Sequence, residues 1–181
     1  MAHLVEPASS GRARCRGCGE RIEKGELRFG ERLDNPFGEG EMTHWFHLEC
    51  AAFKRPEPLL ETLEARDAPL ESQEELMSTA RAGLEHRRLP RVNGAERATS
   101  GRAKCRSCHE TIVKGAWRIP LVFWEEGRFA PSGFIHAGCA RAHLETTDVM
   151  SRVRRFSLGL GEDDLRELQE ELGGPPRRAS M

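Results

Sequence analysis

The chain has 181 residues, 38% of them hydrophobic, and a formal net charge of −1. Its length fits one domain or two, and no apolar run approaches the roughly 20 residues of a membrane-spanning helix, so we expect no membrane partner. Met1 to Ser10 contain neither an apolar core nor a basic leading region, which argues against a secretory signal. We therefore expect a reducing, intracellular compartment: the cytoplasm or nucleoid in a bacterium, the nucleus in a eukaryote.

The charge is distributed unevenly along the chain. Residues 1–55 carry nine basic and nine acidic side chains, residues 56–90 carry four and eight, residues 91–143 carry nine and four, and residues 144–181 carry six and eight. The corresponding net charges are 0, −4, +5 and −2. A basic segment indicates a polyanionic partner, although a solvated basic surface is the alternative explanation.

Residues 1–9 are expected to be an unstructured lead-in. Later in the sequence, a Cys-x2-Cys pair and a His-x2-Cys pair are separated by 28 residues. The second half of the chain repeats this arrangement with 27 residues between the pairs. Three thiolates and one imidazole at such spacings are typical of a closed tetrahedral zinc site, so the sequence predicts two zinc ions. The predicted ligands are Cys15, Cys18, His47 and Cys50 in the first half and Cys105, Cys108, His136 and Cys139 in the second.

Disulfide bonds are the alternative use of these six cysteines. Each half holds three of them, so disulfides would leave one thiol unpaired in each half unless Cys50 and Cys139 pair with each other. The zinc interpretation uses every cysteine once and is the one we favour.

An internal duplication surrounds the two ligand sets. The pattern Ser-Gly-Arg-Ala-x-Cys-Arg-x-Cys-x-Glu-x-Ile-x-Lys-Gly-x-x-Arg begins at Ser10 and again at Ser100. Such a repeat predicts two related domains, and at about 80 residues each they are small enough for a metal crosslink to contribute to stability. The predicted boundaries are 8–89 for the first domain, 90–97 for a linker, 98–174 for the second domain and 175–181 for a flexible tail.

A short strand is expected behind the first Cys pair of each repeat. Lys24-Gly25 predicts a turn, and Leu27-Arg28-Phe29 then alternates apolar and polar residues, as does Trp117-Arg118-Ile119. We therefore expect Arg28 and Arg118 on the solvent-facing side of a sheet. An exposed arginine is ordinarily only surface, but the same residue in both repeats, amid changed neighbours, favours a function.

A loop from Asp34 to Met42 follows this strand. Its glycines and proline predict turns with little packing. Phe37 and Met42 either fold back as a small local core or form an apolar contact surface on a polar loop. The corresponding loop of the second repeat, expected over residues 125–133, carries Phe129 and Pro131.

Helices are expected after each His-x2-Cys pair. The first is interrupted by Pro56, and another follows Ser72, which opens a Ser-Gln-Glu-Glu capping box. The acidic start Glu74-Glu75-Leu76 aligns with Asp163-Asp164-Leu165 at the offset of 89 that also relates the two ligand histidines, so each repeat should end in an acidic helix. These elements predict an α+β fold: two small zinc-stabilised domains, each a short antiparallel sheet with flanking helices.

These motifs resemble the zinc fingers of poly(ADP-ribose) polymerases. The resemblance rests on Gly-Arg-Ala-x-Cys-x2-Cys, then Ile-x-Lys-Gly-x2-Arg, then Trp-Phe-His-x2-Cys. A finger of the same type stands at the front of a eukaryotic DNA ligase, whose Asn-Pro-Phe loop is similar to Asn35-Pro36-Phe37. The resemblance covers both repeats, but the second has Phe134-Ile135-His136 where the family has an aromatic pair before its histidine.

The resemblance implies zinc-dependent binding of DNA strand breaks (nicks, gaps and ends) without sequence specificity. Such a protein would be a damage sensor or an accessory of DNA repair, with a repair enzyme as a further candidate partner. In such fingers the arginine of Gly-Arg-Ala and the strand arginine contact phosphates, and apolar loop residues pack on the base pair exposed at the break. The residues so implied are Arg12, Arg28, Arg102 and Arg118 for phosphates and Phe37, Met42 and Phe129 for the base pair. Since the second repeat is the basic one, we expect it to grip the backbone while the first caps the exposed base pair.

No enzymatic activity and no small-molecule substrate are expected. The chain has neither a glycine-rich phosphate-binding loop nor a nucleophile paired with a base. His47-x-Glu49 followed by Cys105-x2-Cys108 faintly resembles a zinc nucleobase deaminase, but Cys105 lacks the preceding proline and His136 lacks the glutamate. The alternative function is a protein–protein interaction module.

Overall fold

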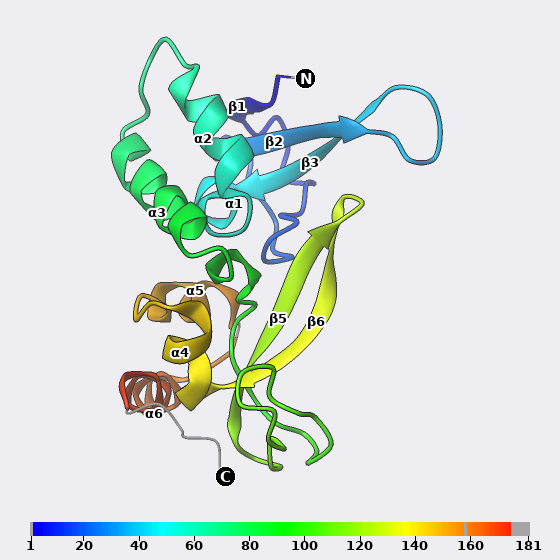
Figure 1. Cartoon of the computed structure of the whole chain (residues 1–181). Coiled ribbons are helices and arrows are strands. Elements are labelled where there is room, and N and C mark those ends of the chain that lie inside the picture. The colour runs from blue at the N-terminus through cyan, green and yellow to red at the C-terminus, as the bar shows by residue number, and fades with distance from the viewer. Residues whose placement is uncertain (1, 158, 175–181) are drawn as a thin grey trace. The chain divides into compact units, whose positions relative to one another are not determined.

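The computed structural model describes residues 2–157 and 159–174 (Figure 1). These residues form two compact units. The first comprises the residues up to Glu85 together with Glu125–Arg128, and the second comprises the residues from His86 onward apart from that segment. Each unit combines a three-stranded sheet with helices, so the predicted α+β class is confirmed. None of the described helices is long and apolar enough to cross a membrane.

The sheet of the first unit begins earlier than expected. Leu4–Pro7 forms a strand that pairs antiparallel with the next one, with Leu4 opposite Gly30. The prediction of an unstructured lead-in over residues 1–9 is therefore wrong, because four residues are too few to show a strand pattern when their partner is distant in the sequence. The unit consists of β1 Leu4–Pro7, β2 Leu27–Asp34, β3 Glu41–His47, α1 Leu48–Lys54, α2 Pro56–Glu64 and α3 Gln73–Glu85.

The core of the first unit lies between its sheet and its helices. Phe29 of β2 and Phe46 of β3 are fully buried, and Leu59 and Leu63 of α2 are buried as well. Helix α1 ends before Pro56, as predicted, and α2 begins at Pro56. A proline is tolerated in the first turn of a helix because the N–H group that it lacks would have no helical partner there.

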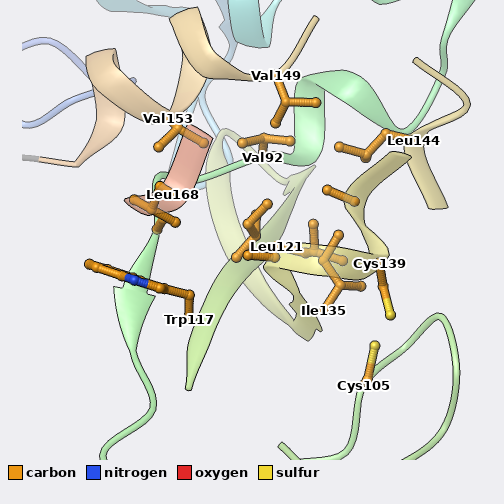
Figure 2. Packing of buried hydrophobic residues seen from close by; sticks show 14 of the residues in the cluster. Val92, Cys105, Trp117, Leu121, Ile135, Cys139, Leu144, Val149, Val153 and Leu168 are labelled. Carbon is orange, nitrogen blue, oxygen red and sulfur yellow. The ribbon is translucent and has the colours of Figure 1, made fainter. Parts of the chain in front are cut away.

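The second unit repeats this plan around its own core. Figure 2 shows Leu121 and Ile135 of its strands surrounded by Leu144, Val153 and Leu168 from three helices. All five side chains are at most 4% exposed. The unit consists of η1 Leu89–Arg91, β4 Glu96–Arg97, β5 Trp117–Glu125, β6 Arg128–His136, η2 Ala137–Cys139, α4 Ala140–Leu144, α5 Met150–Phe156 and α6 Glu162–Gly173.

The segment 90–97, predicted to be a linker, is part of the second unit. Val92 and Ala95 are buried in its core, and β4 at Glu96–Arg97 pairs with β5. Gly94 has a φ of 85°, and a β-carbon there would lie 2.5 Å from the carbonyl oxygen of Phe156. The glycine that suggested a flexible linker is thus needed where the backbone at residue 94 closely approaches that of Phe156. The predicted tail, 175–181, lies outside the described residues.

The loop predicted over residues 125–133 is also wrong. Glu126 and Gly127 have φ values of 49° and 77°, as in a two-residue turn of type I′, and β6 starts immediately afterwards at Arg128. Phe129 and Pro131 therefore belong to a strand. In the first unit the connection between β2 and β3 is a longer loop that extends beyond both strands (Figure 1).

Candidate zinc centres and nucleic-acid interface

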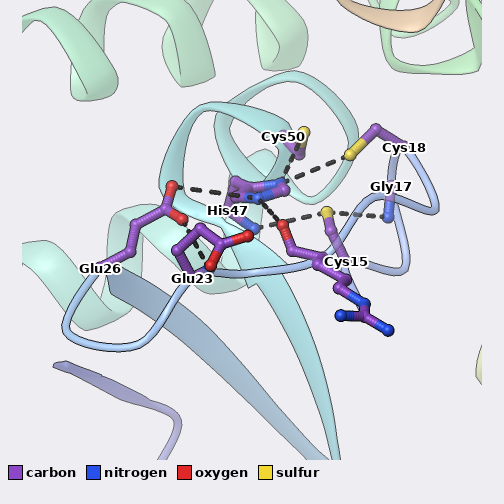
Figure 3. Close-up of polar contacts among 8 residues, drawn as sticks. Cys15, Gly17, Cys18, Glu23, Glu26, His47 and Cys50 are labelled. Carbon is purple, nitrogen blue, oxygen red and sulfur yellow. Dashed lines mark hydrogen bonds and ion pairs between the residues drawn. The ribbon is translucent and has the colours of Figure 1, made fainter. Parts of the chain in front are cut away.

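The four predicted ligands of the first unit lie together at one end of its sheet. The sulfur atoms of Cys15, Cys18 and Cys50 and a ring nitrogen of His47 all lie within 4.8 Å of one another (Figure 3). His47 Nδ1 is 3.4 Å from Cys18 Sγ and 3.9 Å from Cys50 Sγ. Zn–S bonds of about 2.3 Å and Zn–N bonds of about 2.0 Å place tetrahedral sulfur and nitrogen ligands about 3.5 Å apart. The donor set and its spacing therefore fit Zn²⁺.

Three separate elements bring these ligands together. Cys15 and Cys18 lie in a tight turn, His47 is the last residue of β3, and Cys50 is in the first turn of α1. The turn is closed by a hydrogen bond of 2.8 Å from Gly19 N to Cys15 O, and Gly19 has a φ of 78°. A glycine suits this left-handed position.

The imidazole of His47 is oriented by contacts of its far nitrogen. Nε2 lies 3.1 Å from the carbonyl oxygen of Arg21. It also lies 3.9 Å from Glu26 Oε1 (Figure 3). In the tautomer that donates from Nε2, the lone pair of Nδ1 points to the cysteine sulfurs. Such an outer hydrogen bond is what fixes a metal-binding histidine.

The thiols of this cluster influence one another strongly. Hydrogen bonds with the thiols of Cys18 and Cys50 lower the pKa of Cys15 to about 3, and the same type of contact raises the pKa of Cys50. Backbone N–H groups of Gly17 and His47 also donate to Cys15 Sγ, at 3.3 and 3.4 Å. Three crowded sulfurs cannot all ionise by themselves, and a divalent cation supplies the charge that allows it.

The second unit repeats the arrangement of the four ligands. His136 Nδ1 is 3.4 Å from Cys108 Sγ and 3.8 Å from Cys139 Sγ, and His136 N donates to Cys105 Sγ at 3.3 Å. At the closing position of the turn, His109 takes a φ of 64° in place of the glycine. All six cysteines lie within the described residues and are free of disulfides. The chain therefore has two Cys3His zinc sites, and the disulfide alternative is wrong.

The strand arginine of the first unit lies in a different environment from the one predicted. Arg28 is only 6% exposed, whereas its neighbour Leu27 is 38% exposed. Its Nη2 donates to Glu6 Oε1 at 2.7 Å, and its guanidinium carbon is 3.5 Å from the centroid of the Trp45 ring. The prediction of a solvent-facing arginine is wrong because β1 adds a strand beside β2, with Glu6 directly opposite Arg28.

Arg118 has the same environment in the second unit. It is 7% exposed, its Nε and Nη2 donate to Glu96 Oε1 at 2.9 and 2.6 Å, and it lies 3.8 Å from the centroid of the Phe134 ring. Glu96 lies opposite Arg118 across β4 and β5. Each unit thus contains an arginine held between a carboxylate and an aromatic ring.

The two arginines of Gly-Arg-Ala lie at the surface of their units. Arg12 and Arg102 are exposed, and within the described part of the chain neither has an acidic side chain at ion-pair distance. Their charges are available to an external anion.

The loop between β2 and β3 presents Phe37 to solvent. Phe37 is 91% exposed, and the turn that carries it is held by hydrogen bonds from Phe37 N to Asn35 Oδ1 at 3.0 Å and from Asn35 N to Gly40 O at 2.9 Å. Met42 is half-buried in β3, opposite Leu33. Phe37 therefore does not fold back into a local core, and Met42 lies within β3 and not in the loop.

Phe129 differs from Phe37 in both position and packing. It is partly buried in β6, and its ring centroid lies 4.7 Å from that of Trp124 on the neighbouring strand. The structure therefore does not bring it to an exposed loop equivalent to that of Phe37.

Sequence reasoning missed the two glutamates that hold the strand arginines. Glu6 and Glu96 lie upstream of the motif that begins at Ser10 and Ser100, each four residues before its serine. An identical residue at the same offset in both repeats was the available signal. It indicates that the duplication extends further toward the N-terminus than the cysteine motif.

Comparisons with known proteins agree with these geometries. Residues 6–86 match the family described as "Poly(ADP-ribose) polymerase and DNA-Ligase Zn-finger region". The chain is 32% identical over 132 residues to a poly [ADP-ribose] polymerase of Sarcophaga peregrina, covering 64% of this chain and 13% of that protein. It is 33% identical over 132 residues to poly [ADP-ribose] polymerase 1 of Gallus gallus, covering 65% of this chain and 13% of that protein.

A relative of another kind matches over most of the chain. The polynucleotide 3'-phosphatase ZDP of Arabidopsis thaliana is 25% identical over 195 residues, which cover 93% of this chain and 28% of that protein. The chain therefore spans about an eighth of the polymerases and about a quarter of the phosphatase. From the family match and the Cys3His geometry, residues 6–86 are a zinc finger of the poly(ADP-ribose) polymerase type, and the second unit repeats its zinc site.

Proposed function

We propose that this chain binds DNA strand breaks through its two zinc fingers, without sequence specificity, as a damage sensor or accessory in DNA repair. The observation that carries the proposal is Phe37, a large apolar side chain that is 91% exposed on a loop attached to a zinc-stabilised sheet. An intracellular location, in the compartment that holds DNA, is part of the proposal. Enzymatic activity is not part of it.

The physics of a break explains why an exposed phenylalanine is suited to it. In an intact duplex each base face is covered by its neighbours, so an apolar side chain finds no partner there. A nick or end lets the duplex bend and uncovers one face, on which an aromatic ring can stack for about 1–3 kcal/mol. Phe37 is held away from the strands by the turn at Asn35, so it can reach such a face without rearrangement of the core.

Phosphate contacts supply affinity in this proposal but no preference for breaks. Arg12 and Arg102 are exposed and are the phosphate contacts we propose. Arg28 and Arg118 are 6% and 7% exposed and already hold a carboxylate. We therefore give them a different role, which is to fix the aromatic ring and the first strand of each unit beside the contact surface.

The two units have different roles in this proposal. The first carries the projecting loop with Phe37, followed in β3 by Met42, whereas the second has a two-residue turn in place of the loop. Residues 91–143 of the second unit carry nine basic and four acidic side chains. We propose that the first finger covers the exposed base pair and that the second holds the backbone.

The test is binding of the zinc-loaded chain to a nicked duplex and to the same duplex without the nick, at two salt concentrations. Tighter binding to the nicked duplex, weakening steeply with salt, supports the proposal, since each neutralised phosphate contributes a log–log slope of about −0.9. Equal binding to both duplexes contradicts break recognition. Absence of binding to either contradicts a DNA function and favours a protein partner.

A further inference from the structure

Each zinc knuckle, which is the turn over residues 15–18 in the first unit and 105–108 in the second, carries an arginine immediately after its first cysteine ligand. These residues, Arg16 and Arg106, are exposed in both units. Their neighbours differ between the repeats, since Gly17 stands where the second repeat has Ser107. Zinc coordination uses the cysteines and the histidine, and it gives no reason for an arginine at this position.

The backbone of each knuckle arginine is fixed to the sheet. Arg16 N donates to Trp45 O at 2.8 Å, and Arg106 N donates to Phe134 O at 2.8 Å. Trp45 and Phe134 are the aromatic residues whose rings stack on Arg28 and on its counterpart in the second unit. The arginine is therefore held between a zinc ligand and the edge of the last strand, a rigid position in both units.

The side chain of Arg106 follows the surface of β6. A β-carbon added to Gly133 would lie 2.8 Å from Arg106 Nε and 3.3 Å from its Cγ, so the stem crosses the strand where it has no side chain. At the equivalent position the first unit has His44, which is buried. Burial lowers the pKa of His44, and the positive charges of Arg16 and Arg55 lower it further.

The charge of these arginines is not neutralised by the protein. Arg28, Arg55 and Arg97 each have a carboxylate partner. Among the described residues, Arg16 and Arg106 have no acidic side chain at ion-pair distance. An exposed guanidinium on a rigid turn loses little entropy when it binds an anion, and its planar fork matches the oxygens of a phosphate.

We propose that Arg16 and Arg106 are phosphodiester-binding residues, one in each finger, in addition to the arginines of Gly-Arg-Ala. This inference rests on the proposed DNA function. It predicts that the knuckle contributes more than a scaffold, because the metal fixes the position of a cationic side chain that contacts the nucleic-acid backbone.

The experiment compares the double variant R16Q/R106Q with the matched control R81Q/R166Q. Arg81 and Arg166 are exposed arginines on α3 and α6, each paired with a carboxylate. For each zinc-loaded protein the affinity for the nicked duplex is measured across a salt series. Each lost phosphate contact should reduce the slope by about 0.9 and the affinity by about fivefold near physiological salt. The ratio of nicked to intact affinity should stay as in the wild type, since phosphates carry no information about base exposure.

A slope and affinity of R16Q/R106Q equal to those of the control, in a wild-type chain that does bind DNA, would overturn this inference and leave the proposed function intact. Failure of the wild type to bind any duplex would instead overturn both. Zinc content and the thermal midpoint are measured for all variants. They should be unchanged, because the substituted side chains are exposed.

Discussion

Arg28 donates a hydrogen bond of 2.7 Å to Glu6 across the first two strands, and this pair joins the start of the chain to the strand that follows the first zinc knuckle. The guanidinium is almost fully buried, while the Glu6 side chain is 44% exposed. The same pair recurs between Glu96 and Arg118. Its repetition indicates that both fingers need a carboxylate beside the strand arginine.

Removal of this carboxylate should destabilise the first unit. Glu6→Gln leaves the buried guanidinium of Arg28 without its charged partner, and we expect the free energy of unfolding to fall by about 1–2 kcal/mol. Urea denaturation of the zinc-loaded chain measures the change. The control is Glu39→Gln, an exposed residue of the loop between β2 and β3. Equal stability of the two variants would show that the ion pair contributes nothing.

Each zinc site should stabilise its own unit. Cys15→Ser should reduce the zinc content from two ions to one and unfold the first unit, and Cys105→Ser should do the same for the second, because a small domain that loses its metal crosslink loses much of its folding energy. Metal content by elemental analysis and two separate unfolding transitions are the readouts. Retention of two zinc ions by either variant would contradict the assignment of ligands.

Acid should release the zinc ions and at the same time lower the free energy of unfolding. The pKa of Cys15 is lowered from 9.0 to about 3 by its contacts with the other thiols. A group with a depressed pKa in the folded state binds fewer protons there than in the unfolded chain, so its contribution is present above pH 9 and is lost as the pH falls toward 3. Unfolding free energy measured against pH should therefore decrease toward acid. A protein with equal stability across this range would exclude thiolate ligands.

The zinc sites could be predicted from the sequence because ligand type and spacing are local properties. Cys15-x2-Cys18 and His47-x2-Cys50 each place two ligands three residues apart, so the sequence specifies the site almost completely. The burial of Arg28 could not be predicted in this way. It depends on β1, whose four residues show no pattern of their own and become a strand only through pairing with β2.

The difference between the two hairpins could not be predicted from the sequence either. Glycine and proline over residues 125–133 suggest a loop like that of the first unit, but Glu126-Gly127 forms a two-residue turn and the strands continue to it. Pairing between β5 and β6 and contact between Trp124 and Phe129 decide the outcome, and neither is a property of a short window of sequence. The duplicated knuckles therefore support hairpins of different shape.

Substitution of Phe129 should accordingly lower the stability of the second unit and leave break recognition unchanged. Phe129→Ala removes its contact with Trp124 and should lower the stability of the second unit by about 1–2 kcal/mol, as for loss of a partly buried aromatic pair. Thermal unfolding measures this change, and the nicked-to-intact affinity ratio should remain that of the wild type. A lower ratio with unchanged stability would place Phe129 at the break and contradict its assignment to the sheet.

Phe37 should give the opposite result. Because it is 91% exposed, Phe37→Ala should leave the thermal midpoint unchanged but reduce the preference for the nicked duplex about tenfold, the loss expected for one stacked base. The matched control is Val113→Ala, since Val113 is also an exposed apolar residue, at 62%, but lies outside the β2–β3 loop. The affinity for the intact duplex should change little in either variant, because a covered base pair offers Phe37 no surface. If both variants keep the wild-type preference, Phe37 is not the residue that recognises the break.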